Sequence, residues 1–177
     1  MENDKSLSDK ATSDKATSDK AISDRTNTGQ PSNKQPTKFD PKSVHKFLGK
    51  IGHGGFLDMG FEGHGDDWVE LSLNWREDLV ADAKNGVLAS SVVISLMDNA
   101  CSIAIWNKVQ EFRPQVTMDL RVDYLRPSPK GAKIFGRGIC YHVTRRIGFV
   151  RGVAHNGDID SPLAHVSGTF IRLPGGF

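Results

Sequence analysis

The segment from Val87 to Trp106 constrains the fold of this chain more than any other part of the sequence. Its apolar residues recur on nearly every side of a helix, and it contains neither proline nor glycine. About twenty residues of this kind predict one long helix over 90–107 that is buried on most sides. Other secondary structure must therefore surround this helix.

Segments with strand character lie on both sides of the predicted helix. Residues 69–75 alternate apolar and polar, which is typical of a half-buried strand. Four segments rich in β-branched and aromatic residues follow the helix, separated by turn sequences that include the hairpin signal Asn156-Gly157: 116–124, 133–143, 148–155 and 163–173. In 116–124 the apolar residues have even numbers, so these are expected to face the core. This order predicts an α+β fold, with an antiparallel sheet wrapped around one helix.

The first 40 residues differ in composition from the rest of the chain. Ser-Asp-Lys or Ser-Asp-Arg recurs every five residues up to Arg25, and seven basic and seven acidic side chains accompany very few apolar ones. Such a segment buries too little apolar surface to offset the entropy of ordering it. We therefore predict a disordered tail over 1–40 and a single domain over 41–177.

Composition excludes several classes of function. A formal net charge of +2 argues against a nucleic-acid partner. No apolar run is long enough for a membrane span, and the first residues lack a secretory signal. Cys101 and Cys140 lie in apolar segments without metal-ligand spacing, and His53-Gly54-Gly55 lacks the neighbouring ligands that a metal site needs. A cytoplasmic protein with reduced cysteines and no metal or cofactor is expected.

Asp98 is the one formal charge in the predicted helix between Ser90 and Trp106. A buried carboxylate must be neutral, hydrogen-bonded or open to a cleft, so Asp98 is a candidate general base or nucleophile. The alternative is a surface aspartate paired with a neighbouring chain. Ser90 or Ser91 can cap the helix, and the free N–H groups at its start can polarise a carbonyl oxygen. Simple capping is the alternative there.

Several motifs in order resemble the hotdog-fold thioesterases of the PaaI-like (phenylacetic-acid-pathway) group, over residues 47–173. The motifs are Leu48-Gly49, Gly86-Val87-Leu88, Ser95–Ala100, Val116–Pro127, Arg146–Phe149 and Ser167–Phe170. The resemblance implies an acyl-CoA thioesterase that forms a homodimer or homotetramer, with its thioester cleft at the dimer interface. No cofactor is implied.

The resemblance also assigns roles to residues. Asp98 matches the catalytic carboxylate, and Thr117 matches a hydroxyl that positions the attacking water and arrives from the neighbouring subunit. Ser90 matches the residue whose backbone N–H polarises the thioester carbonyl. Substrate binding is assigned to residues around these, with the basic side chains at turns and strand ends as candidates for the coenzyme A phosphates: Ser91, Asn85, Gly86, Arg126, Lys130, Arg145 and Arg146. A solvated surface is the alternative for the basic residues.

The sequence departs from its relatives at the start of the helix. Ala89-Ser90-Ser91 stands where the family has His-Gly-Gly, and the His-Gly-Gly at residues 53–55 lies about 36 residues too early to serve as that motif. A backbone donor survives such a change, whereas an imidazole does not. Hydrolysis of an acyl-CoA, at a rate weakened by this loss, is therefore the main expectation. The alternative is a non-catalytic acyl-CoA-binding hotdog protein, a sensor or an accessory subunit.

Overall fold

The structure is a computed structural model that describes residues 39–174, so the predicted tail lies outside the described residues except for its last two positions. This part of the chain contains three α-helices, α1 (Pro41–Leu48), α2 (Gly52–Leu57) and α3 (Ser90–Val109), and a short 3-10 helix over Glu77–Leu79. The strands are β1 (Gly60–His64), β2 (Trp68–Leu73), β3 (Val80–Asp82), β4 (Val87–Leu88), β5 (Gln115–Tyr124), β6 (Ile134–Val143), β7 (Ile147–His155) and β8 (Ala164–Arg172).

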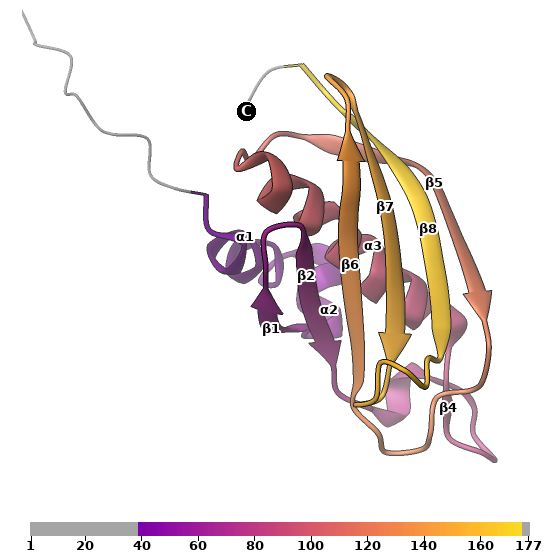
Figure 1. The fold of residues 1–177 in the computed structure, drawn as a ribbon. Helices are drawn as coiled ribbons and strands as arrows, with labels where there is room; N and C mark the ends of the chain where they lie inside the picture. The colour runs from indigo at the N-terminus through magenta and orange to yellow at the C-terminus, as the bar shows by residue number, and fades with distance from the viewer. Residues whose placement is uncertain (1–38, 175–177) are drawn as a thin grey trace, which may run out of the picture. The chain divides into compact units, whose positions relative to one another are not determined.

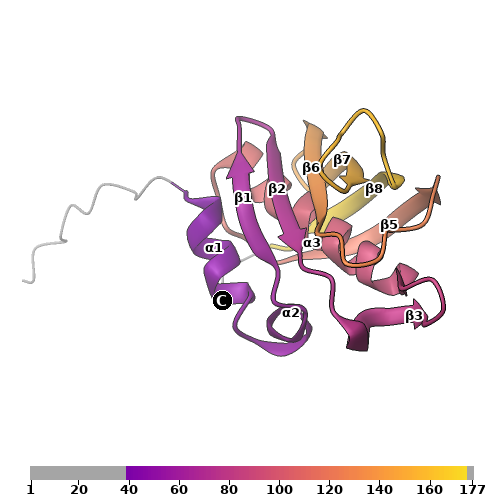
Figure 2. The same ribbon diagram turned by 90° about the horizontal axis from the view of Figure 1, so that it is seen from below.

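Six of the strands form one antiparallel sheet in the order β1-β2-β6-β7-β8-β5, and β3 and β4 form a separate pair. The long helix α3 lies against one face of the six-stranded sheet, which curves around it (Figures 1 and 2). The predicted α+β architecture, with an antiparallel sheet wrapped around one long helix, is confirmed. In this sheet β5 is an edge strand, although it follows α3 directly in the chain.

The apolar character of α3 has a direct structural counterpart. Eleven of its residues are buried, on the side that meets the sheet and on the sides that meet α1 and the loops. The helix backbone comes so close to β6 that a Cβ atom at Gly138 would lie 2.5 Å from the Cys101 nitrogen and 2.6 Å from the Ala100 carbonyl carbon. Gly138 therefore sets the distance between helix and sheet.

The elements that the sequence did not predict are short. They include α1, which Asp40 caps by accepting hydrogen bonds from the N–H groups of Lys42 and Ser43, and also α2, β1, β3 and β4. The connection between β7 and β8 spans 156–163, so Asn156-Gly157 begins a longer loop and not a two-residue hairpin turn. The capping prediction at α3 is wrong, because the N-cap is Ala89 and no side chain caps the helix.

Both cysteines lie in the core, as expected, and neither forms a disulfide. Burial raises the pKa of the Cys140 thiol to about 11 and raises that of Cys101 still further. Both sulfurs therefore stay protonated at neutral pH, where a protonated thiol is a poor nucleophile. Neither belongs to the chemistry of a site.

We expect Gly138→Ala to lower the free energy of unfolding by about 2–3 kcal/mol, because the added methyl group meets helix backbone that cannot rotate away. Gly63→Ala is the matched control, since its Cβ would lie 3.6 Å from the Trp68 ring, an ordinary contact. Urea denaturation of both variants measures the difference. Equal stability of the two would contradict direct packing of α3 on β6.

Candidate active site

Asp98 lies near the middle of α3 and is hydrogen-bonded to a side chain from β5. The Thr117 hydroxyl donates to Asp98 Oδ1 over 2.7 Å, and both residues belong to the same chain. The bond thus forms within one chain, whereas the resemblance implies a Thr117 that arrives from a neighbouring subunit. Thr117 itself is exposed and Asp98 is half-buried, so the pair lies where a ligand can approach it.

A β-bulge in β5 turns Thr117 toward the helix. Thr117 is paired with Phe170 of β8, but two positions later Asp119 is paired with Thr169, so Met118 is the extra residue. Because Phe170 is a buried residue on the inner face of the sheet, its partner Thr117 lies on that face too. A bulge of this kind redirects side chains and is frequent beside active sites.

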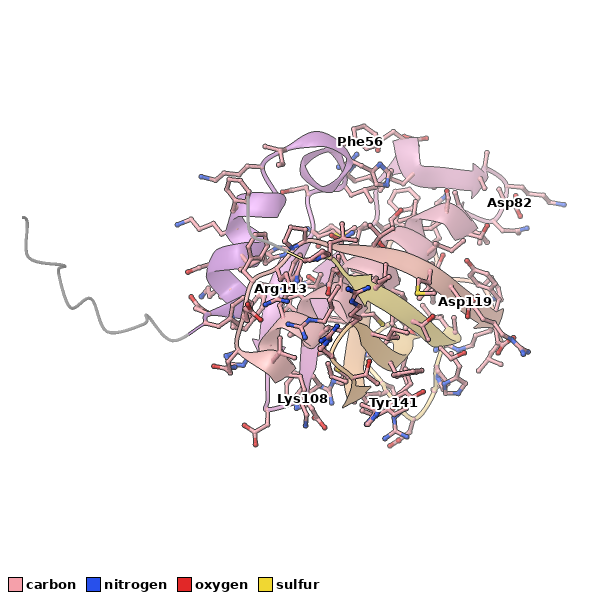
Figure 3. All side chains as sticks on the ribbon, turned by 90° about the horizontal axis from the view of Figure 1, so that it is seen from above. Phe56, Asp82, Lys108, Arg113, Asp119 and Tyr141 are labelled. Carbon is pink, nitrogen blue, oxygen red and sulfur yellow. The ribbon has the colours of Figure 1, made fainter. Side chains whose placement is uncertain are left out.

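Because of the bulge, the prediction that every even-numbered residue of 116–124 faces the core is wrong for part of the strand. Beyond the bulge the prediction holds for Leu120 and Val122, which pack against the core, but not for Tyr124, which is 46% exposed. Before it the alternation is reversed, and Val116 and Met118 are 52% and 58% exposed. Asp119, labelled in Figure 3, follows the extra residue directly.

The environment of Asp98 favours its protonated form. Burial raises the pKa of this carboxyl above its ordinary value of 3.8, and the hydrogen bond from Thr117 lowers it by a smaller amount. Removing a carboxylate from water disfavours its charge, whereas a hydroxyl that donates to it favours the charge. A carboxylate with a raised pKa is a stronger base than a solvated one.

Asp98 is one of four polar residues on one face of α3, which we call the polar stripe: Ser91, Ser95, Asp98 and Ser102. Their spacing of three or four residues places them on the same side of the helix. Gln115 of β5 donates to the Ser102 side-chain and backbone oxygens, over 2.6 and 2.7 Å. Side chains from β5 thus approach the stripe at two of its four positions.

A histidine from α2 contacts the polar stripe as well. His53 Nε2 lies 2.9 Å from the Ser95 hydroxyl oxygen, which itself donates to the Ser91 carbonyl. Sequence reasoning placed His53 only in a motif at the wrong position. No periodicity or spacing in the sequence connects residues 53 and 95, so this contact could be found only in the structure.

The start of α3 carries backbone donors without a side-chain cap. The N–H groups of Ser90 and Ser91 donate to no group within the described part of the chain, and the Tyr124 hydroxyl donates to the Ser90 carbonyl over 2.8 Å. Eight residues separate Ser90 from Asp98, which corresponds to about 12 Å along a helix. One chain therefore does not bring these donors to its own carboxylate.

Two cavities lie beside the start of α3, and a third lies at the turn between β3 and β4. An apolar cavity of about 320 Å³ is lined by Ser90, Val93, Tyr124 and Leu163, among others. A smaller one, of about 190 Å³, lies on the other side of the helix and is bordered by His53, Ala89 and Ser91. A third, of about 330 Å³, is lined by Gly86 and Lys130.

The four basic residues predicted to bind phosphates lie in two separate places within one chain. Lys130 contacts Gly86 just before α3, and Arg126 is hydrogen-bonded to Asn156 and to the Ser161 carbonyl. The other two, Arg145 and Arg146, form the β6–β7 turn at the opposite end of the sheet, where the Arg146 carbonyl accepts from the N–H of Arg172. A single cluster of all four is therefore not present in one chain.

The remaining predicted residues have structural partners. The Asn85 side chain donates to Asp82 over 2.7 Å, and the carbonyl of Gly86 accepts from the Trp75 indole. Gly86 has a φ of +68°, which favours glycine. Within residues 39–174, no three His, Cys, Asp or Glu side chains gather to hold a metal ion. No helix of this part of the chain is long and apolar enough to cross a membrane.

Comparison with known proteins assigns the fold. A Pseudomonas aeruginosa protein is 29% identical, with a TM-score of 0.68 over 76% of this chain and 100% of that one. A thioesterase of Haemophilus influenzae is 18% identical (TM-score 0.67, 77% and 92%), and the PaaI protein of the E. coli phenylacetic acid degradation operon is 15% identical (TM-score 0.65, 75% and 92%). No curated protein matches the chain significantly.

These matches show that the chain has the hotdog fold. Residues 85–162, from the turn before β4 to the β7–β8 loop, match the thioesterase superfamily. The predicted resemblance to PaaI-like hotdog thioesterases is thereby confirmed. The matched segment contains α3, β5 and the Asp98–Thr117 pair.

We expect Asp98→Asn to raise Tm at pH 7. Because burial raises the pKa of Asp98, the folded chain holds this proton more tightly than the unfolded chain, and stability falls as pH rises from 3.8 through the raised pKa. Asparagine has no charge to bury, so this loss of stability is removed, and its side-chain oxygen still accepts a hydrogen bond from Thr117. Thermal melts should show that the Tm difference between Asp98→Asn and wild type vanishes below about pH 3, where the Asp98 carboxyl is protonated in both the folded and the unfolded chain. Asp119→Asn is the exposed control, and a lower Tm of Asp98→Asn at pH 7 would contradict this assignment.

Proposed function

We propose that the protein hydrolyses acyl-CoA thioesters, with Asp98 as the general base or nucleophile of a site at a dimer interface. The observation that carries this proposal is the Asp98–Thr117 hydrogen bond on an accessible, half-buried face of α3. The match of residues 85–162 to the thioesterase superfamily supports this reaction class. The acyl group itself is left open by the geometry.

In the reaction, a water oxygen forms a bond to the thioester carbonyl carbon while its proton passes to Asp98. The C–S bond then breaks, the electron pair leaves with sulfur, and the thiol is released after protonation. Thr117 orients the carboxylate or the water through its hydroxyl. General bases of this kind contribute about 10²–10⁴ in rate. If Asp98 attacks directly, its carboxylate oxygen bonds to the acyl carbon as the C–S bond breaks and the thiolate leaves, and water then hydrolyses the resulting anhydride.

A second copy of the chain completes the site in this proposal. The Ser90 N–H group, the candidate donor to the carbonyl oxygen, lies about 12 Å along α3 from Asp98 of its own chain. The partner's α3 is therefore the natural source of the donor. In addition, β5 is a sheet edge with the exposed residues Val116 and Met118, which is a surface that a second β5 can cover.

The same dimer would unite the basic residues. Strands paired antiparallel across a two-fold axis bring the Gln115 end of one β5 beside the Tyr124 end of the other. Arg145 and Arg146 lie near the first end, whereas Arg126 and Lys130 follow the second. We therefore assign the coenzyme A phosphates to basic side chains contributed by both subunits.

A non-catalytic acyl-CoA-binding protein is the second candidate function. It is favoured by Ala89-Ser90-Ser91 at the start of α3, where the methyl group of Ala89 can neither donate nor accept a hydrogen bond. Removing one donor from an oxyanion site slows catalysis by about 10²–10³ in well-studied enzymes. The two candidates are separated by measuring turnover and binding on the same acyl-CoAs.

We expect Asp98→Asn to lower kcat for acyl-CoA hydrolysis by about 10² or more, because the base is lost while the shape is kept. Thr117→Ala should lower kcat less, because water can replace a hydroxyl donor. Thiol release gives the rates, and thermal shift gives the binding, which should be little changed. Hydrolysis by Asp98→Asn at the wild-type rate would refute the role of Asp98. Binding without turnover by the wild type would favour the second candidate.

Light scattering at micromolar concentration should show a dimer of twice 19.4 kDa, or a pair of dimers. The reason is that the edge strand β5 exposes apolar side chains along its bulged half. Met118→Lys places a charge on this surface and should increase the monomer fraction and lower activity together. A monomeric and fully active wild type would contradict the shared site.

A further inference from the structure

We propose that His53 is a further catalytic residue that donates a proton to the leaving sulfur. This inference rests on the proposed thioesterase function, because it assigns the leaving-group acid of the same site. It arises from the contact between α2 and the polar stripe, which joins two segments 42 residues apart in the sequence.

The hydrogen bonds at Ser95 define which nitrogen of His53 carries a proton. The Ser95 hydroxyl donates its hydrogen to the Ser91 carbonyl over 2.9 Å, so its oxygen is left to accept. In this arrangement, the form of His53 that carries a hydrogen on Nε2 donates to that oxygen over 2.9 Å. The imidazole is thus presented to the polar stripe with an N–H group.

The residue of α3 that His53 contacts lies within one helical turn of Asp98. Ser95, which holds His53, is three residues before Asp98, so the two lie on the same face. Thr117 reaches that face from β5, while His53 reaches it from α2. A carboxylate, a hydroxyl and an imidazole from three elements therefore meet along the polar stripe.

A cavity gives a ligand access to His53. The hollow of about 190 Å³ is bordered by His53 and by Ala89 and Ser91 at the start of α3. The acidic side chain on its wall, Asp78, is paired with Arg76 over 2.9 Å and so is already neutralised. Phe56 of α2, labelled at the periphery in Figure 3, is 57% exposed at the rim.

The other histidines of the described residues are placed elsewhere. His45 is bound to the Met59 carbonyl, and His155 is bound to Glu70 within the sheet. His165 is exposed on β8. Of the imidazoles in residues 39–174, that of His53 is the one hydrogen-bonded to α3. Ala89 contributes only a methyl group to the same cavity.

The chemistry gives the two titratable groups complementary tasks. Asp98 takes a proton from the attacking water, which suits a carboxyl whose pKa is raised by burial. When the C–S bond breaks, its electron pair goes to sulfur, and His53, as the imidazolium, passes one ring proton to that sulfur and becomes neutral. The proton that Asp98 took from water then passes to His53, which restores the imidazolium and the carboxylate. Sites in which two titratable groups take the opposite tasks of base and acid are common in hydrolysis.

The test compares two substrates with the same acyl group and different leaving groups. One is the acyl-CoA, whose alkyl thiolate is basic; the other is the thiophenyl ester, whose aryl thiolate is far less basic and leaves without a proton. We expect His53→Gln to lower kcat about 30-fold to 100-fold on the acyl-CoA, within the range of general acids. On the thiophenyl ester it should change kcat less than about threefold.

Three variants serve as controls. Asp98→Asn should lose activity on both substrates, because both need the attack of water. His165→Gln changes an exposed imidazole on β8 and should keep wild-type rates. Ser95→Ala keeps His53 but removes the oxygen that holds it, and should show the same dependence on leaving group with a smaller loss. This last variant also decides the matter if His53→Gln fails to fold in thermal melts.

Each outcome has one meaning. An equal loss on both substrates shows that His53 is only structural and overturns the proposal, as does the absence of any loss. Wild type and His165→Gln inactive on both substrates would overturn the thioesterase function together with the role of His53. An active wild type with an unaffected His53→Gln would overturn only the role of His53.

Discussion

The contact between the backbone of α3 and the glycine at position 138 of β6 is the constraint on which the rest of the structure depends. It lets the helix lie directly on the sheet, with Ala100 and Cys101 facing β6. At about 100° per residue, Asp98 then lies about 200° around the helix from Ala100. The rotation that buries the small residues against β6 thus turns the polar stripe away from that central strand, toward α2 and the edge strand β5.

The β-bulge in β5 positions Thr117, the second residue of the candidate site. Regular pairing with β8 would keep Val116 and Met118 on the inner face and turn Thr117 outward. The extra residue at Met118 reverses this for the first half of the strand. The strand thereby exposes two apolar side chains and places a hydroxyl on Asp98. One feature thus serves both the proposed chemistry and the proposed contact with a second chain.

In the proposed function, the carboxyl of Asp98 serves the reaction at a cost in stability. Its burial makes the charged form unfavourable, and a single hydroxyl offsets only part of that effect. A helix built for stability alone would carry an apolar residue at this position. Retaining the acid in mostly apolar surroundings is typical of sites that trade stability for reactivity.

The sequence by itself determined the long helix, the four strands after it and Asp98 as the exceptional charge. These follow from local periodicity and from the cost of burying a carboxylate, which depend on neighbours in the chain. The family motifs likewise singled out Thr117. Only the tertiary structure decided that Thr117 meets Asp98 of its own chain, because the bulge depends on pairing with β8. The tertiary structure also decided that His53 contacts Ser95, and that the basic residues predicted to bind phosphates are divided between two ends of the sheet. These placements arise from packing between segments far apart in the chain, and local sequence patterns contain no information about such packing.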